Sequence, residues 1–128
     1  MPNWIFVVKS STDFTKRLEQ RKWPIYNRTT NRNRLRAGDN VIFYLAGEDG
    51  KKFLGTARLG SGLKKAEQID YLVDLDDIEI WEKHVKIHDV IEELEFIVYK
   101  RNWGVHFQGG VIRLSDKDYT TITTKVKK

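Results

Sequence analysis

The sequence predicts an α+β fold, namely a small mixed β-barrel, closed or nearly closed, of five to six strands with two to three short helices. Short runs rich in β-branched and aromatic residues are separated by turn signals, which is typical of such strands. Two serine capping boxes each precede apolar residues at helical spacing. The 128 residues are 40% hydrophobic, which is enough apolar material for one core. We therefore expect residues 1–128 to form a single domain.

The strands are predicted from the apolar runs. We expect buried strands over residues 4–8, 41–45 and 53–59, and one or two more between residues 72 and 87. A turn at Asp49 and Gly50 joins the second strand to the third as a hairpin. An irregularity is expected at Asp76 and Asp77, where the apolar pattern is interrupted.

The helices are predicted from caps and apolar spacing. Ser10 or Ser11 caps the first helix, which ends before Pro24 because proline disfavours helical geometry in the residue before it. Apolar residues in 90–98 follow helical spacing and predict a short amphipathic helix. Ser115 begins the C-terminal helix.

The remaining segments have no helical period. Residues 23–34 carry Pro, Asn, Thr and several arginines and are predicted to form an irregular surface loop. Residues 103–114 contain three glycines and are predicted to be extended, with bulges or close backbone approaches.

Charge is distributed unevenly along a chain whose net charge is +5. Residues 16–36 hold eight basic side chains and one acid, whereas residues 67–95 hold eleven acids and two lysines. The basic segment is suited to a phosphate backbone, although two solvated faces of opposite sign would give the same count. In that case the acidic segment would lie on a different side of the molecule from the phosphate backbone.

Several classes of site are excluded or disfavoured. The absence of cysteine excludes disulfides, thiolate metal sites and a cysteine nucleophile. His84 and His88 lack the further ligands of a zinc site, so no metal and no cofactor is expected. The first apolar run is too short for a signal peptide or a membrane span, which makes a cytoplasmic protein without membrane attachment the expectation.

The order of motifs resembles the EVE family of PUA-like barrels. The matching words are KWP at residues 22–24, LRAGDNVIFY at 35–44, LGTA at 54–57 and RNWG at 101–104, followed by HFQG and IRLS. The likeness covers nearly the whole chain. It implies a PUA-like barrel that binds nucleic acid, either RNA or DNA, without catalysing a reaction.

The chain is also similar to the YTH domain, a reader of N6-methyladenosine built on the same barrel. The similarity lies in Lys9-Ser10-Ser11, in Trp23 and in KFLGTARL at residues 52–59. It implies that Trp23 forms one wall of an aromatic cage, with Tyr71 or Trp81 as the second. An extruded base, and by this likeness a modified one, would be held there.

The candidate base pocket combines flat rings with hydrogen-bonding groups. An aromatic face next to a basic segment is suited to stacking an unstacked base, and hydroxyls and amides can contact its edge. Each residue also has a structural role open to it, as a core aromatic or as a cap. The predicted pocket residues are Trp23, Ser10, Ser11, Asn27, Tyr71 and Trp103.

The candidate phosphate contacts are cations that lie close to this pocket in sequence. The arginine fork matches phosphate oxygens, and a loop can spread its side chains along a backbone. The predicted residues are Lys9, Arg28, Arg32, Arg34 and Arg36.

Two other functions remain open from the sequence. An ASCH-like RNA or nucleotide hydrolase would need a lysine or an acid in the cleft. Separately, the clustered acids of residues 74–79 could hold magnesium for phosphodiester cleavage, or form the outward face of a strand. A protein-interaction module could use the acidic segment as its working face.

Overall fold

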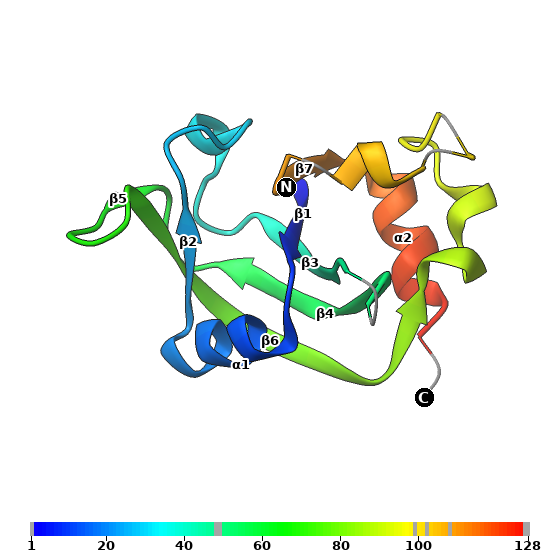
Figure 1. The fold of residues 1–128 in the computed structure, drawn as a ribbon, viewed down its shortest axis with the longest axis horizontal. Coiled ribbons are helices and arrows are strands. Elements are labelled where there is room, and N and C mark those ends of the chain that lie inside the picture. Colours follow the sequence, from blue (N-terminus) through cyan, green and yellow to red (C-terminus); the bar gives the residue numbers. More distant parts are fainter. Residues whose placement is uncertain (1, 48–49, 99, 102, 108, 127–128) are drawn as a thin grey trace.

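A seven-stranded mixed sheet forms the centre of the computed structural model, which describes residues 2–47, 50–98, 100–101, 103–107 and 109–126 (Figure 1). The strands are β1 (Asn3–Val8), β2 (Lys22–Ile25), β3 (Asn40–Leu45), β4 (Lys52–Leu59), β5 (Lys64–Lys65), β6 (Tyr71–Lys86) and β7 (Val111–Leu114). Their order is β2-β6-β4-β3-β1-β7, with β5 paired to β6. β1 and β3 run parallel and the other pairs are antiparallel.

The predicted α+β, PUA-like fold class is confirmed, but the sheet curls into a half-barrel with β2 and β7 at its edges and not into the expected closed or nearly closed barrel. The strand count rises to seven because β2 and the two-residue β5 were not predicted. Curvature is aided at Gly55 on β4, where a Cβ atom would collide with the carbonyl oxygen of Glu79 on β6. Asp77 has a positive φ of 50° on β6, so the expected irregularity at residues 76–77 is confirmed as a distortion within one long strand.

Two α-helices cover opposite faces of the sheet. α1 (Ser11–Gln20) begins at Ser10, whose hydroxyl accepts a hydrogen bond from the Asp13 N–H, and α2 (Asp116–Thr124) begins at Ser115 in the same way. Both predicted serine caps are therefore confirmed. Figure 1 shows α1 near β2 and α2 at the other end, near β7.

The two covered faces explain the unbroken apolar runs of β1 and β3. Successive side chains point to opposite faces, so Phe43 enters the core that includes Phe14 of α1. Tyr44 enters the second core, which includes Ile122 of α2. A strand that is buried on both faces is apolar along nearly its whole length, as β1 and β3 are after their first residue.

Three segments differ from the prediction. Residues 22–25 form β2 and not a loop, because Trp23 and Ile25 pair with Val73 and Tyr71 of β6. The predicted helix over 90–98 is absent, and the 3₁₀ turns Ile87–Asp89 and Ile91–Glu93 lie there and just before it. Residues 103–114 begin with a 3₁₀ helix, Trp103–Phe107, before β7.

The hairpin turn was predicted at Asp49 and Gly50. Asp49 lies outside the described residues, but β3 and β4 pair antiparallel on either side of the turn. Within the described part of the chain, no helix is long and apolar enough to cross a membrane.

Candidate nucleic-acid interface

A cavity of about 360 Å³ opens between the end of β1, α1 and β2, and we name it the base cavity. Its size lies within the usual range for sites that hold small molecules. The lining residues are Val7, Val8, Lys9, Asp13, Arg17, Trp23, Pro24, Ile25, Tyr26, Thr29, Gly110 and Val111. Aromatic, cationic and acidic groups therefore meet around one hollow.

Trp23 lies in the wall of the base cavity but is not an exposed platform. Only 2% of the residue is exposed, and its ring stacks on Phe43 with centroids 5.2 Å apart. Phe6 lies 5.6 Å away, and the guanidinium of Arg17 lies 4.6 Å from the ring centroid. The expected open indole is thus corrected: core aromatics and an arginine cover most of the ring, and the cavity adjoins it.

Arg17 and Tyr26 supply the more accessible planar groups. Tyr26 is 52% exposed at the end of β2. Burial against Trp23 lowers the pKa of Arg17, while Tyr26 and Asp13 act in the opposite direction. Asp13 lies one helical turn before Arg17, so both side chains reach the cavity from the same face of α1.

The other predicted base-pocket residues lie outside this lining. Ser10 serves as the cap of α1 and Ser11 is exposed in its first turn. Asn27 uses its N–H to donate to Asp70 at 2.7 Å, and Tyr71 lies beneath the guanidinium of Arg32 at 5.3 Å. These four residues were expected in the pocket, and none of them lines this cavity.

Trp103 lies at a different cavity. It contacts Phe107 and His88 edge to face, at centroid distances of 6.0 and 5.8 Å. The prediction placed it with Trp23 because its motif resembles the EVE ending. The structure separates the two tryptophans between the two cores.

The predicted phosphate-binding residues divide into two exposed side chains, Lys9 and Arg28, and three arginines that make contacts within the protein. Lys9 and Arg28 are exposed, and Arg28 lies on the turn closed by the Thr29 N–H donating to the Tyr26 carbonyl at 2.9 Å. Arg32 donates to the Asn27 carbonyl at 2.8 Å, so its guanidinium helps to fold the loop.

The two remaining arginines also make contacts within the protein. Arg36 donates to the carbonyls of Asn33 and Leu35, at 2.8 and 2.9 Å. The guanidinium of Arg34 lies 6.0 Å from the ring centroid of Trp4.

The acidic segment does not form a metal-binding group among the residues that the structure describes. Asp74 accepts hydrogen bonds from Lys64 at 2.6 Å and Lys22 at 2.9 Å, and these bonds lower its pKa. Asp76, Asp77 and Glu79 are exposed on β6. One of the four clustered acids is therefore engaged in ion pairs that join β2, β5 and β6.

Comparison with known proteins places the fold. No family model matches the chain. A UPF0310 protein of Mycolicibacterium vanbaalenii is 29% identical over 101 residues, which cover 70% of this chain and 68% of that protein.

Solved structures match over nearly the whole chain. Human THYN1 in complex with DNA containing 5-methylcytosine has a TM-score of 0.70 at 8% identity, covering 100% of this chain and 99% of that chain. The Mmi1 YTH domain has a TM-score of 0.69 at 13% identity, covering 98% and 95%. The chain has an EVE/YTH-like fold. A protein of Leishmania major with the same fold has a TM-score of 0.74 at 15% identity, covering 98% of this chain and 94% of that one.

The two residues expected as a second cage wall, Tyr71 and Trp81, lie on opposite faces of the sheet. Trp81 belongs to the core on the face opposite Trp23. Tyr71 packs against the core of Trp23 and is partly exposed. Of the two alternatives, only Tyr71 shares a face of the sheet with Trp23.

Sequence reasoning missed four polar or aromatic residues of the base cavity: Asp13, Arg17, Tyr26 and Thr29. Two of them could have been found from the sequence, because Asp13 and Arg17 are four residues apart on the predicted helix and therefore share one of its faces. Tyr26 and Thr29 carry none, since their place depends on the pairing of β2 with β6.

Proposed function

We propose that this domain binds nucleic acid, without turnover, through the face formed by α1, β2 and residues 26–36, and that one unstacked base enters the base cavity. The observation that carries the proposal is the meeting of Trp23, Arg17, Tyr26 and Lys9 around one hollow of about 360 Å³. Planar groups stack an extruded base and cations attract its phosphates. The fold shared with THYN1, whose structure contains 5-methylcytosine DNA, supports the same partner.

The base is proposed to lie against the guanidinium of Arg17 and the ring of Tyr26. Both groups are planar and line the cavity, and the Arg17 guanidinium already stacks on Trp23. Asp13 provides a carboxylate that accepts a hydrogen bond from an exocyclic amino group. Adenine, cytosine and guanine carry such a group, so we expect these bases to be preferred over thymine and uracil.

A methylated base would gain further contact in this cavity. Val8, Ile25 and Val111 form an apolar part of its lining. Burying one methyl group there contributes about 0.8 kcal/mol, or about fourfold in affinity. Selection for a modified base would therefore come from the apolar part of the lining.

Phosphate contacts are assigned to Lys9 and Arg28. Both are exposed; Lys9 lines the cavity, and Arg28 lies between the lining residue Thr29 and Asn27 on the adjoining turn. Arg32 and Arg36 are assigned mainly to the shape of the loop, because their guanidinium groups donate to backbone carbonyls. A contact with a single strand contributes about 0.7 to the slope of log affinity against log salt concentration.

The test is fluorescence anisotropy with short labelled single-stranded DNA and RNA, with unmodified and methylated bases. Tyr26→Ala should weaken binding by about 5- to 150-fold, since stacking contributes about 1 to 3 kcal/mol per base. Tyr26 is 52% exposed, so this change should leave the fold intact. Arg28→Ala should lower the salt slope by about 0.7.

The matched control is Arg58→Ala, because Arg58 is also exposed but lies on β4 at a hollow lined by Tyr119 of α2, outside the face formed by α1, β2 and residues 26–36. It should leave both the affinity and the salt slope unchanged. Equal losses in Arg28→Ala and Arg58→Ala would indicate non-specific attraction and would contradict the proposed face. Cleavage of the labelled strand on addition of magnesium would instead favour the ASCH-like hydrolase.

A further inference from the structure

A cavity of about 650 Å³ lies where β6 ends, beside the start of β4 and the end of α2, and we name it the lysine cavity. Its charged lining residues are Lys52, Lys83, Lys86, Lys125 and Asp89. Four lysines and one aspartate leave a formal excess of three positive charges around one hollow. Among the described residues, the lysine cavity and the base cavity share no lining residue, and Figure 1 shows the end of β6 well away from β2.

A bulge in β6 brings some of these side chains to the lysine cavity. Phe53 and Gly55, two residues apart on β4, pair with residues that are five apart on β6. Four residues of β6 therefore lie opposite a single residue of β4. Such a bulge bends the strand and changes the direction in which its side chains point. Lys83 and His84 lie within the bulge, and both line the cavity.

The lysines of this cavity lie close together without compensating acids. Lys52 and Lys86 are direct cross-strand partners, and two like charges in directly opposite positions destabilise the pairing of strands. Among the residues that the structure describes, Lys52, Lys83 and Lys86 have no acid within ion-pair distance. Lys125 differs, because it pairs with Glu93 at 2.9 Å. Three unpaired cations thus line one hollow, and an anion bound there would lower their mutual repulsion.

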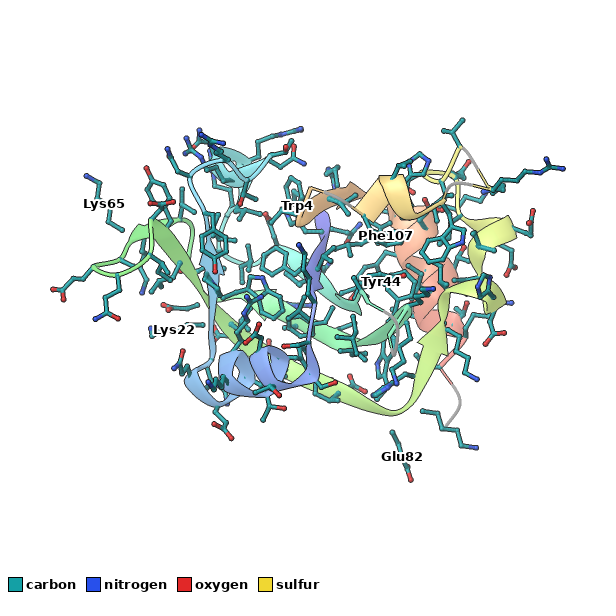
Figure 2. All side chains as sticks on the ribbon, in the orientation of Figure 1. Trp4, Lys22, Tyr44, Lys65, Glu82 and Phe107 are labelled. Carbon is teal, nitrogen blue, oxygen red and sulfur yellow. The ribbon has the colours of Figure 1, made fainter. Side chains whose placement is uncertain are left out.

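The acids of the same segment lie mostly elsewhere. Residues 67–95 hold eleven acids and two lysines, yet both lysines line the cavity and Asp89 is the one acid of this segment that does. Figure 2 shows Glu82, the neighbour of Lys83 in sequence, extending away from β6. Partial burial and, after it, the charge of Lys52 lower the pKa of His84, as expected for a group beside a cationic hollow. The lysine cavity is therefore a local reversal of the charge of its segment.

We propose that the lysine cavity binds a ligand with two or more neighbouring phosphate groups, either successive phosphates of a nucleic-acid strand or a free polyphosphate. The ammonium group is a compact cation that pairs with phosphate oxygens, and lysines from two strands can surround one anion. A hollow of about 650 Å³ is much larger than a single phosphate ion needs, which favours several linked groups. The residues involved are separate from the base cavity, so this inference does not depend on the proposed function.

The first readout is thermal unfolding of the whole chain with sodium tripolyphosphate, compared with sodium sulfate at equal ionic strength. The sulfate series accounts for screening and for general stabilisation by salt. At ten times its Kd, tripolyphosphate should raise the Tm by about 4 °C or more beyond the sulfate value. A Tm that follows the sulfate series at every concentration would overturn the proposal.

The double variant Lys83→Gln/Lys86→Gln removes two of the three unpaired charges. Both residues are exposed, and repulsion between Lys52 and Lys86 is relieved, so the Tm without ligand should stay the same or rise. The shift caused by tripolyphosphate should fall to less than half of its native value. A clear fall in the Tm without ligand would mean that the two lysines make stabilising contacts within the protein. That result would contradict the unpaired charges and overturn the proposal.

The matched control is Lys65→Gln. Lys65 is exposed on β5, and Figure 2 shows it at the end of the molecule opposite Glu82. This variant should keep the full shift with tripolyphosphate. Equal losses in Lys65→Gln and in the double variant would show non-specific attraction to a basic protein, and the lysine cavity would then be rejected as a site.

Fluorescence anisotropy with labelled single strands distinguishes the two sources of phosphate. If the cavity contacts a nucleic-acid backbone, the double variant should lower the slope of log affinity against log salt concentration by about 1.4, from two contacts of about 0.7 each. If the cavity takes a free polyphosphate, this slope should not change although the tripolyphosphate shift is lost. Either result supports a phosphate ligand and names its source.

Tyr26→Ala in the base cavity separates failure of this inference from failure of the proposed function. If it weakens binding of the strand while tripolyphosphate acts only as sulfate does, this inference fails and the proposed function stands. If it has no effect on the strand while the double variant loses the tripolyphosphate shift, the proposed function fails and the lysine cavity stands.

Discussion

Replacement of Trp23 by alanine should be among the most destabilising changes in this domain. The indole is 2% exposed and stacks on Phe43 at 5.2 Å, with Phe6 at 5.6 Å and Phe14 at 6.3 Å. Deleting a buried tryptophan costs about 3 to 5 kcal/mol through lost transfer free energy and the void that remains. The aromatic pairs contribute about 0.5 to 1.5 kcal/mol beyond their area.

The expected loss is a large share of the total stability. A domain is typically stable by about 5 to 15 kcal/mol, so a loss of 4 kcal/mol removes at least about a quarter of it. The adjoining base cavity moderates the cost, because water can enter the new void from an existing hollow of about 360 Å³. We therefore expect about 3 to 4 kcal/mol, toward the lower end of the range.

The assay is urea unfolding followed by circular dichroism, with Tyr26→Ala as the control. Tyr26 lies three residues away and is 52% exposed, so its removal should change the free energy of unfolding by less than about 0.5 kcal/mol. A loss of less than about 1 kcal/mol for Trp23→Ala would refute the buried stack. A large loss would also show that binding assays of Trp23→Ala report folding and not recognition.

Two further predictions concern charged groups. The buried carboxylate of Asp118 accepts hydrogen bonds from the N–H groups of residues 95 and 96, one on each oxygen, at 2.9 and 3.0 Å. Asp118→Asn keeps one acceptor oxygen and should cost about 1.5 to 3 kcal/mol in urea unfolding; unchanged amide hydrogen exchange at both residues would contradict this. For Asp74, its two lysine partners lower the pKa, so the ion pairs stabilise the fold above about pH 4 and lose this effect as the pH falls through the folded pKa. The difference in unfolding free energy between native protein and Asp74→Asn should be below about 1 kcal/mol at pH 7 and shrink toward pH 2; a difference independent of pH would exclude the ion pairs as its source.

Local signals predicted most of the fold. The apolar runs of β1, β3 and β4 and the serine caps of α1 and α2 are set by neighbouring residues, and all five elements are present. The irregularity at residues 76–77 was readable for the same reason, because the acids interrupt an apolar pattern where Asp77 takes a positive φ.

Segments whose structure depends on distant partners were wrong or incomplete. β2 forms because Trp23 pairs with Val73 about fifty residues later, and no local pattern in residues 22–25 indicates it. The expected helix over 90–98 is replaced by 3₁₀ turns, and the segment that follows them is held by Asp118 through the N–H groups of residues 95 and 96. The hydrogen bonds to Asp118 of α2 therefore determine the backbone conformation here more than the helical spacing of apolar residues does.

The sequence by itself determined the α+β class, the basic character of residues 16–36 and the supply of aromatic rings near them. Only the tertiary structure decided how those rings are used. Pairing of β2 with β6 and the curl of the sheet bury Trp23 against Phe43, while the 3₁₀ segment carries Trp103 to the opposite core. The physical reason is that burial and cavity shape are sums over contacts distant in sequence, whereas composition and spacing report on neighbours alone.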